Sequence, residues 1–105
     1  MEWADKAYIA RKKGQWEASI ELARQALRYE IEAAEKLPPV AESEPTRSIL
    51  YRGAASLAYQ ARDYELALRL IKKGYTTYTP EEIRVDFRDI EHARIREVKD
   101  ERDLF

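Results

Sequence analysis

The chain has 105 residues, of which 45% are hydrophobic and 37% charged, with a net charge of −1, three Gly, four Pro and no Cys. This apolar content excludes a disordered chain, the few turn-forming residues argue against a β-rich fold, and the lack of Cys excludes disulfides and thiolate metal sites. The near-neutral charge argues against a dedicated nucleic-acid binder, because such domains carry an excess of Lys and Arg.

The length is that of a single domain, residues 1–105, and the abundance of Ala, Leu, Glu and Arg predicts an all-α fold. The first predicted hairpin spans residues 2–36. Its first helix covers about 2–13 and ends at Gly14, a residue that favours the left-handed conformation found after helices. Its second helix covers about 15–36 and carries two apolar lines, which predicts that neighbours cover it on two sides. The two lines are Trp16, Ile20, Ala23 and Leu27, and Leu22, Ala26, Tyr29 and Ala33.

A proline-rich loop is predicted at residues 37–45, because a residue that precedes proline is disfavoured in helical geometry. The second hairpin spans residues 46–78. Its two helices cover about 46–61 and 64–75, with a tight turn between them. The side chains expected to face inward from the later helix are Ala67, Leu68, Leu70 and Ile71.

A closing helix is predicted at residues 80–100. Thr79 is its expected N-cap, Pro80 occupies the first helical position, and two acidic residues follow in the first turn. After Ala93 the charges alternate in sign, which predicts an end that frays or projects. The apolar stripe expected to cover the second hairpin consists of Ile83, Phe87 and Ile90.

Two segments of the chain are similar to each other when aligned without gaps, residues 14–27 and residues 62–75. Small residues at matching positions let two antiparallel helices approach closely, and an aromatic residue after each turn fills the open end of the hairpin. The pattern resembles the tetratricopeptide repeat, whose turn region reads Gly-Asp-Tyr-x-x-Ala. The matching residues are Gly14, Trp16, Ser19, Ala26 and Leu27 in the first copy, and Asp63, Tyr64, Ala67 and Gly74 in the second.

The resemblance covers about residues 3–30 and 50–77, and it implies a right-handed stack of antiparallel helical hairpins with about five helices. The second copy begins 48 residues after the first, at 62 against 14, whereas the repeat is typically 34 residues long. Two copies are also fewer than the three or so that usually form a continuous core. A generic helical bundle with the same Ala and Leu spacing is the alternative fold.

In the tetratricopeptide repeat, the first helix of each hairpin lines the concave groove. The resemblance therefore implies a ligand groove formed by Tyr8, Arg11, Lys12, Arg52, Ser56, Tyr59 and Gln60. Aromatic and Arg side chains suit an extended or acidic peptide. The form of the repeat that grips a peptide carboxylate uses asparagines, and this chain has no Asn. For Tyr8 and Tyr59 the alternative is ordinary packing against the next helix.

A catalytic or metal-binding set is not recognisable in the sequence. His92 is the only His, and a metal would need it together with Asp89 and with Glu82 or Asp86. A solvated charged helix face explains these residues more simply. The serines lack a base in a known motif, and the scattered glycines form no phosphate-binding loop. We therefore expect no enzyme activity, no cofactor and no metal.

The predicted function is that of a scaffold or adaptor that binds a peptide or protein, or that self-associates as a homodimer because a short array leaves apolar ends uncovered. Charge is unevenly distributed, −3 over residues 80–105 and +2 over residues 37–79, which could help self-association or orient a charged ligand. The alternative is a nucleic-acid-associated accessory protein, although the net charge makes nucleic acid the less expected partner. Its contacts would be the basic residues Arg11, Lys12, Arg52, Lys72 and Lys73.

The expected location is the cytoplasm. No apolar run approaches the ~20 residues of a membrane span, and the first five residues do not read as a signal peptide, so no membrane association is expected. The lack of Asn and Cys and the many charges are typical of proteins from hot environments, although a GC-rich genome would explain part of the same bias.

Overall fold

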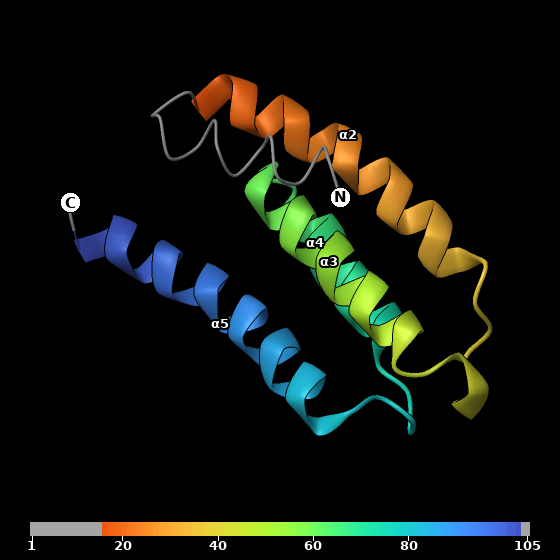
Figure 1. Ribbon diagram of the computed structural model, residues 1–105. Coiled ribbons are helices and arrows are strands. Elements are labelled where there is room, and N and C mark those ends of the chain that lie inside the picture. Colours follow the sequence, from red (N-terminus) through yellow and green to blue (C-terminus); the bar gives the residue numbers. More distant parts are fainter. Residues whose placement is uncertain (1–15, 104–105) are drawn as a thin grey trace.

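The computed structural model describes residues 16–103, and the surroundings of side chains within 17–93. In this part of the chain there are four α-helices, one short 3-10 helix and no strand, which confirms the all-α prediction. The predicted first helix, residues 2–13, lies outside the described residues, as does Gly14. The elements are α2 (Trp16–Glu35), η1 (Ala41–Ser43), α3 (Thr46–Gln60), α4 (Tyr64–Gly74) and α5 (Glu81–Asp103), shown in Figure 1.

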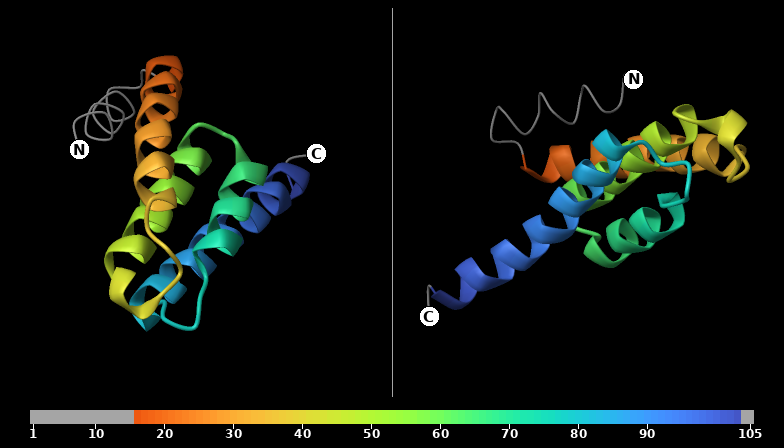
Figure 2. Two further views of the ribbon diagram at one scale, coloured as in Figure 1. Left: turned by 90° about the vertical axis from the view of Figure 1, so that its right-hand side faces the viewer. Right: turned by 90° about the horizontal axis from the view of Figure 1, so that it is seen from below.

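The bounds of α2, α3 and α4 lie within one residue of the predicted ones, which is the ordinary uncertainty of a helix end. The closing helix is longer than the predicted range of 80–100, because α5 continues unbroken to Asp103. Its C-terminal half projects beyond the other described helices (Figure 2). Arg, Glu and Lys are good helix formers, so the alternating charges after Ala93 do not end the helix.

The central element of the described part is α3. It packs between α2 and α5, while α4 covers a further side of it (Figure 1). The chain directions in Figure 1 make α2 and α4 antiparallel to α3, and α5 parallel to it. Alanine dominates the core, and its small side chain lets the helices approach closely. The buried core residues are Ala23, Ala26, Leu27, Ala34, Tyr51, Ala54, Ala55, Leu57, Ala58, Ala61, Ala67, Leu70, Ile71, Ile83 and Phe87.

The turn between α3 and α4 closes the end of α3 with two backbone hydrogen bonds. The Asp63 N–H donates to the Ala58 carbonyl at 2.9 Å, and the Arg62 N–H donates to the Tyr59 carbonyl at 3.0 Å. This pair of bonds is a Schellman motif, in which the residue after the helix takes a left-handed conformation. Arg62 has φ 62°, and it occupies the position that Gly14 holds in the first copy of the repeat.

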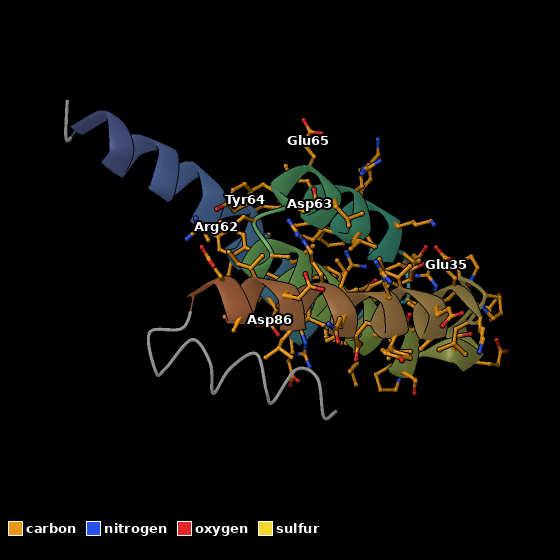
Figure 3. The ribbon with its side chains drawn as sticks, turned by 90° about the horizontal axis from the view of Figure 1, so that it is seen from above. Glu35, Arg62, Asp63, Tyr64, Glu65 and Asp86 are labelled. Carbon is orange, nitrogen blue, oxygen red and sulfur yellow. The ribbon has the colours of Figure 1, made fainter. Side chains whose placement is uncertain are left out.

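The same turn starts α4. One Asp63 carboxylate oxygen accepts a hydrogen bond from the Leu66 N–H at 3.2 Å, which caps the first turn of the helix. The Tyr64 ring meets the Tyr59 ring edge-on, with centroids 5.2 Å apart. Figure 3 shows Arg62, Asp63 and Tyr64 gathered at this end of the hairpin, with Glu65 pointing away from it.

One detail of the second hairpin differs from the prediction. Leu68 was expected to face inward, but the residue is 44% exposed, because the buried face of α4 follows Ala67, Leu70 and Ile71 at helical spacing and Leu68 falls beside that line. Leu68 is therefore an exposed apolar residue rather than a core residue.

The predicted N-cap of the closing helix has another role. The Thr79 hydroxyl donates to the Gly74 carbonyl at 3.2 Å and accepts from the Thr76 N–H at 2.9 Å, so it closes the loop after α4. The carbonyl of Pro80 accepts the first bond of α5, from the Arg84 N–H at 3.0 Å. The Thr79 side chain therefore forms a hydrogen bond with the carbonyl at the end of α4 rather than capping the start of α5.

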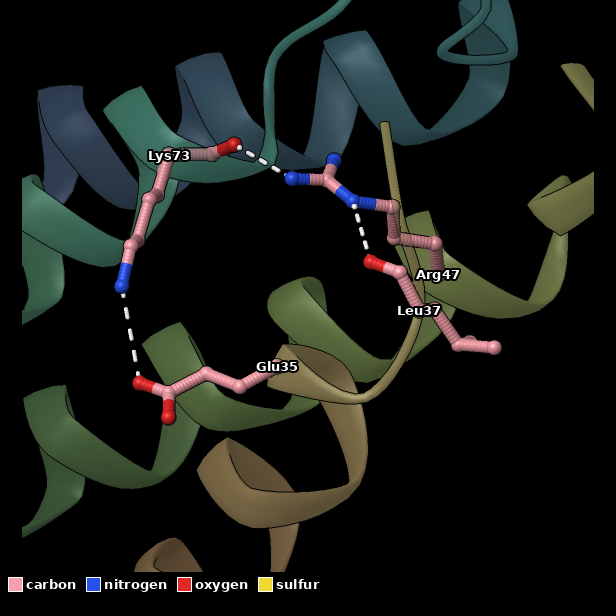
Figure 4. Close-up of polar contacts among 4 residues, drawn as sticks. All are labelled: Glu35, Leu37, Arg47 and Lys73. Atoms are coloured by element: carbon pink, nitrogen blue, oxygen red, sulfur yellow. Dashed lines mark hydrogen bonds and ion pairs between the residues drawn. The ribbon is translucent and has the colours of Figure 1, made fainter. Parts of the chain in front are cut away.

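Arg47, near the start of α3, joins the ends of two other helices (Figure 4). Its guanidinium donates to the carbonyls of Leu37 at 3.3 Å, Lys73 at 3.1 Å and Gly74 at 3.3 Å. The group also lies 4.7 Å from the centre of the Tyr51 ring, and Arg47 is only 5% exposed. A buried positive charge is thus stabilised by carbonyl oxygens at the negative ends of helices and by a ring face.

Phe87 holds α5 against the rest of the fold. It is fully buried, and its ring meets the Tyr75 ring edge-on with centroids 4.9 Å apart. Gly74 makes room for this contact, since a Cβ atom there would lie 2.9 Å from the Phe87 ring and 2.8 Å from the Tyr51 Cβ atom. Ile83 is also buried and Ile90 packs on the core at its edge, as the apolar stripe predicts.

Candidate binding groove

The predicted groove residues of α3 lie beside α5. Ser56, Tyr59 and Gln60 of α3 line a hollow of about 250 Å³ together with residues of α5. The complete described lining, which we call the α3–α5 groove, is Ser56, Tyr59, Gln60, Asp89, Ile90 and Ala93. The other predicted groove residues of the first hairpin, Tyr8, Arg11 and Lys12, lie outside the described part of the chain.

Arg52, the fourth predicted groove residue of α3, forms an ion pair. Its guanidinium donates to an Asp86 carboxylate oxygen at 2.8 Å, with 37% of the Arg52 side chain and 44% of the Asp86 side chain exposed. A pair this exposed adds little to stability. Its effect is on charge and register: it neutralises Arg52 and sets residue 52 of α3 beside residue 86 of α5, one helical turn before the groove.

The groove carries negative charge from α5. Glu82, Asp86 and Asp89 follow one another at spacings of four and three residues, which places them on one face of the helix. Asp86 is neutralised by Arg52, whereas Glu82 and Asp89 form no ion pair within residues 17–93. From the sequence these carboxylates are candidate metal ligands and not groove residues, although their helical spacing is visible there.

Tyr59 contributes both to packing and to the groove. Its ring is half-buried, packs at the edge of the core and meets the Tyr64 ring. The same side chain forms part of the groove lining. Ordinary packing, the alternative considered for Tyr59, thus accounts for the side of the ring that faces the core. That packing also fixes the position of the ring beside the groove.

A second, larger hollow of about 700 Å³ lies along α2. Its described lining comes from this helix alone: Glu21, Gln25, Arg28, Tyr29, Ile31, Glu32 and Glu35. Several of these groups already interact, since the Gln25 amide donates to Glu21 at 3.3 Å and Glu35 lies 3.5 Å from the Lys73 ammonium. In the α3–α5 groove, by contrast, two described helices form the walls.

Two of the basic residues considered for nucleic-acid contact, Lys73 and Arg52, lie on different sides of the described fold. The Lys73 ammonium faces Glu35 on α2 (Figure 4), whereas Arg52 faces Asp86 on α5. These two helices lie on opposite sides of α3 (Figure 1). Arg11 and Lys12 lie outside the described residues, so the arrangement gives no support to the nucleic-acid alternative.

His92 is exposed on α5. Within the part of the chain that the structure describes, no three His, Cys, Asp or Glu side chains gather closely enough to hold a metal ion. In the same residues, no helix combines the length and the apolar character that crossing a membrane requires.

Comparison with models of protein families, with curated proteins and with solved structures finds no match for this chain. The resemblance to the tetratricopeptide repeat therefore depends on the sequence pattern alone.

One buried carboxylate lies away from the groove, between α2 and α3. Glu30 is 2% exposed, and its Oε1 atom has no hydrogen-bond partner. Gly53 of α3 provides the space, because a Cβ atom there would lie 2.9 Å from the Glu30 Oε2 atom. Burial raises the pKa of Glu30 above its ordinary value of 4.5, since a charged carboxylate is poorly solvated at this interface.

Replacing Glu30 with Gln is expected to stabilise the protein at neutral pH. A raised pKa in the folded state means that Glu30 contributes most to stability below pH 4.5, and that this contribution is lost as the pH rises through the folded-state pKa. Glu30→Gln should therefore gain roughly 1 kcal/mol at pH 7 and nothing near pH 4, because it removes a poorly solvated charge. Urea unfolding at several pH values measures this difference. Glu32→Gln, an exposed change on the same helix, should show none, and equal curves for Glu30→Gln and the wild type would contradict the prediction.

Proposed function

We propose that this protein is a non-enzymatic interaction module of the tetratricopeptide type that binds a segment of a partner protein in the α3–α5 groove. The observation that supports this most is the meeting of Ser56, Tyr59 and Gln60 with three residues of α5 around one hollow. These α3 residues were selected from the repeat pattern alone, as the wall of a peptide groove.

The size of the groove favours a protein segment over a small-molecule ligand. Ligand pockets of enzymes and receptors are typically about 300–1,000 Å³ and enclose most of the ligand. A hollow of about 250 Å³ between two exposed helix faces accommodates a side chain and leaves the rest of the ligand outside. An extended segment that inserts one side chain and runs along both helices fits this shape.

The test fills the groove and compares partner binding. Ser56→Trp places a large ring in the hollow, and Arg69→Trp introduces the same ring at an exposed position of α4. The partner is first identified by affinity purification from the native host and is then purified for calorimetric titration. We expect Ser56→Trp to weaken its affinity at least tenfold, equivalent to about 1.4 kcal/mol, and Arg69→Trp to leave it unchanged. Equal affinities for the two variants, both folded by circular dichroism, would refute the proposal.

A second copy of the chain is the other occupant that the short array of hairpins suggests. Sedimentation velocity over a wide concentration range distinguishes the two cases. A dimer that Ser56→Trp dissociates would assign the groove to self-association. A monomer at all concentrations would exclude this occupant.

A further inference from the structure

The charge of the α3–α5 groove restricts what it binds. Among its six described lining residues, Asp89 is the one that carries a formal charge. The nearest cation of α3, Arg52, is neutralised by Asp86 at 2.8 Å. Glu82 adds a second carboxylate to the same face of α5, so negative charge gathers on the face of α5 that borders the groove.

The uncharged lining residues complement this charge. The Ser56 hydroxyl and the Gln60 amide oxygen are hydrogen-bond acceptors on α3, facing Asp89 across the groove. Tyr59 contributes an aromatic ring whose position is fixed by its edge-on contact with Tyr64. A carboxylate, neutral acceptors and a ring together suit a positively charged side chain with several N–H donors.

The volume agrees with a single side chain. A hollow of about 250 Å³ has room for one extended arginine or lysine side chain. An acidic side chain would instead bring a second carboxylate close to Asp89, and like charges at short range repel.

We infer that the α3–α5 groove recognises a basic side chain, arginine or lysine, in the partner segment, with Asp89 as the principal anion. This inference rests on the proposed docking function and names its chemistry. It differs from the acidic peptide that the sequence suggested, because Arg52 is engaged by Asp86 and because α5 adds Asp89 to the site.

The test uses the full chain labelled with ¹⁵N and two small probes, N-acetyl-arginine methylamide and N-acetyl-glutamate methylamide. We expect the arginine probe to shift the backbone amide signals of the groove residues in a saturable way, with a dissociation constant in the millimolar range typical of fragments. Added salt should weaken this binding, because charge attraction at an exposed site is screened. The glutamate probe should cause no saturable shift at the same amides.

Two variants that each remove one negative charge distinguish an effect of the groove from an effect of the overall surface charge. Asp89→Asn should lower the affinity for the arginine probe at least fivefold. Glu65→Gln, on a side chain that points away from the hairpin end on α4 (Figure 3), should leave it unchanged. The exposed position of Asp89 lets Asp89→Asn fold normally, which a ¹⁵N spectrum checks directly.

The inference is overturned if Asp89→Asn binds the arginine probe as tightly as the wild type, or if the glutamate probe binds the groove equally well. These results are separable from failure of the docking proposal. Loss of partner binding in Ser56→Trp, combined with no arginine binding, would keep the groove as a docking site and reject its basic specificity. Partner binding that survives Ser56→Trp would reject the docking proposal whatever the probes do.

Discussion

Replacing Arg47 with Met is expected to lower the free energy of unfolding by roughly 3 kcal/mol. Arg47 is 5% exposed, and its guanidinium donates to three backbone carbonyls, of which the Gly74 carbonyl keeps the Thr79 hydroxyl as a second donor once the guanidinium is removed. Two of these carbonyls, of Lys73 and Gly74, end α4, where the helix dipole is negative. Met fills a similar volume, so the loss should reflect the hydrogen bonds and the contact with the Tyr51 ring rather than a cavity.

Urea unfolding followed by circular dichroism measures this prediction. Arg47→Lys keeps the charge but cannot reach three acceptors in fixed directions, so an intermediate loss is expected. Arg69→Met, at an exposed position of α4, should change stability by less than about 0.5 kcal/mol. If Arg47→Met proved as stable as the wild type, the gain from removing a buried charge would have offset the lost bonds, as happens for some buried ion pairs.

Replacing Phe87 with Ala is expected to cost about 3–5 kcal/mol, because a fully buried aromatic side chain is removed from a site that cannot collapse. The Tyr75 ring would lose its edge-on partner. Gly74 lies so close to the Phe87 ring that a Cβ atom there would touch it. Because Gly74 has no side chain, this part of the backbone has nothing that could fill the cavity left by Phe87→Ala.

The same change should also affect the groove, since Phe87 holds the helix that supplies Asp89. We expect Phe87→Ala to abolish saturable binding of N-acetyl-arginine methylamide under conditions where the variant is still helical. Phe87→Leu should retain most of the stability and the binding, because it keeps much of the buried volume. Val85→Ala, at an exposed position of α5, is the control and should leave both unchanged. Normal probe binding by a destabilised Phe87→Ala would contradict the role of Phe87 in positioning α5.

The helices themselves could be predicted from the sequence because their cause is local. The proline-rich loop, the turn at residues 62–63 and the spacing of Ile83, Phe87 and Ile90 gave helix bounds close to those of α2, α3 and α4 and identified the buried stripe of α5. Periodicity states which face of a helix is apolar, and this information depends only on neighbours within a few turns. Leu68 shows its limit, because an apolar residue beside the buried line is indistinguishable from one on it until the partner helix is placed.

The lining of the α3–α5 groove was only half predictable, because it too depends on how the helices pack. The repeat pattern selected Ser56, Tyr59 and Gln60, which do lie together, but it assigned α5 the role of a cover and so missed Asp89 as part of the wall. The pairing of Arg52 with Asp86 joins residues 34 positions apart, and it depends on α5 running parallel to α3 in one register.

Local patterns in the sequence thus determined the helical class, the helix bounds and the apolar faces of this protein. The tertiary structure decided which charges remain unpaired. It neutralised Arg52, enclosed Arg47 among carbonyls and Glu30 beside Gly53, and left Asp89 facing the groove. Electrostatic interactions depend on distances in space between groups far apart in the chain, and one sequence without its packing does not contain those distances.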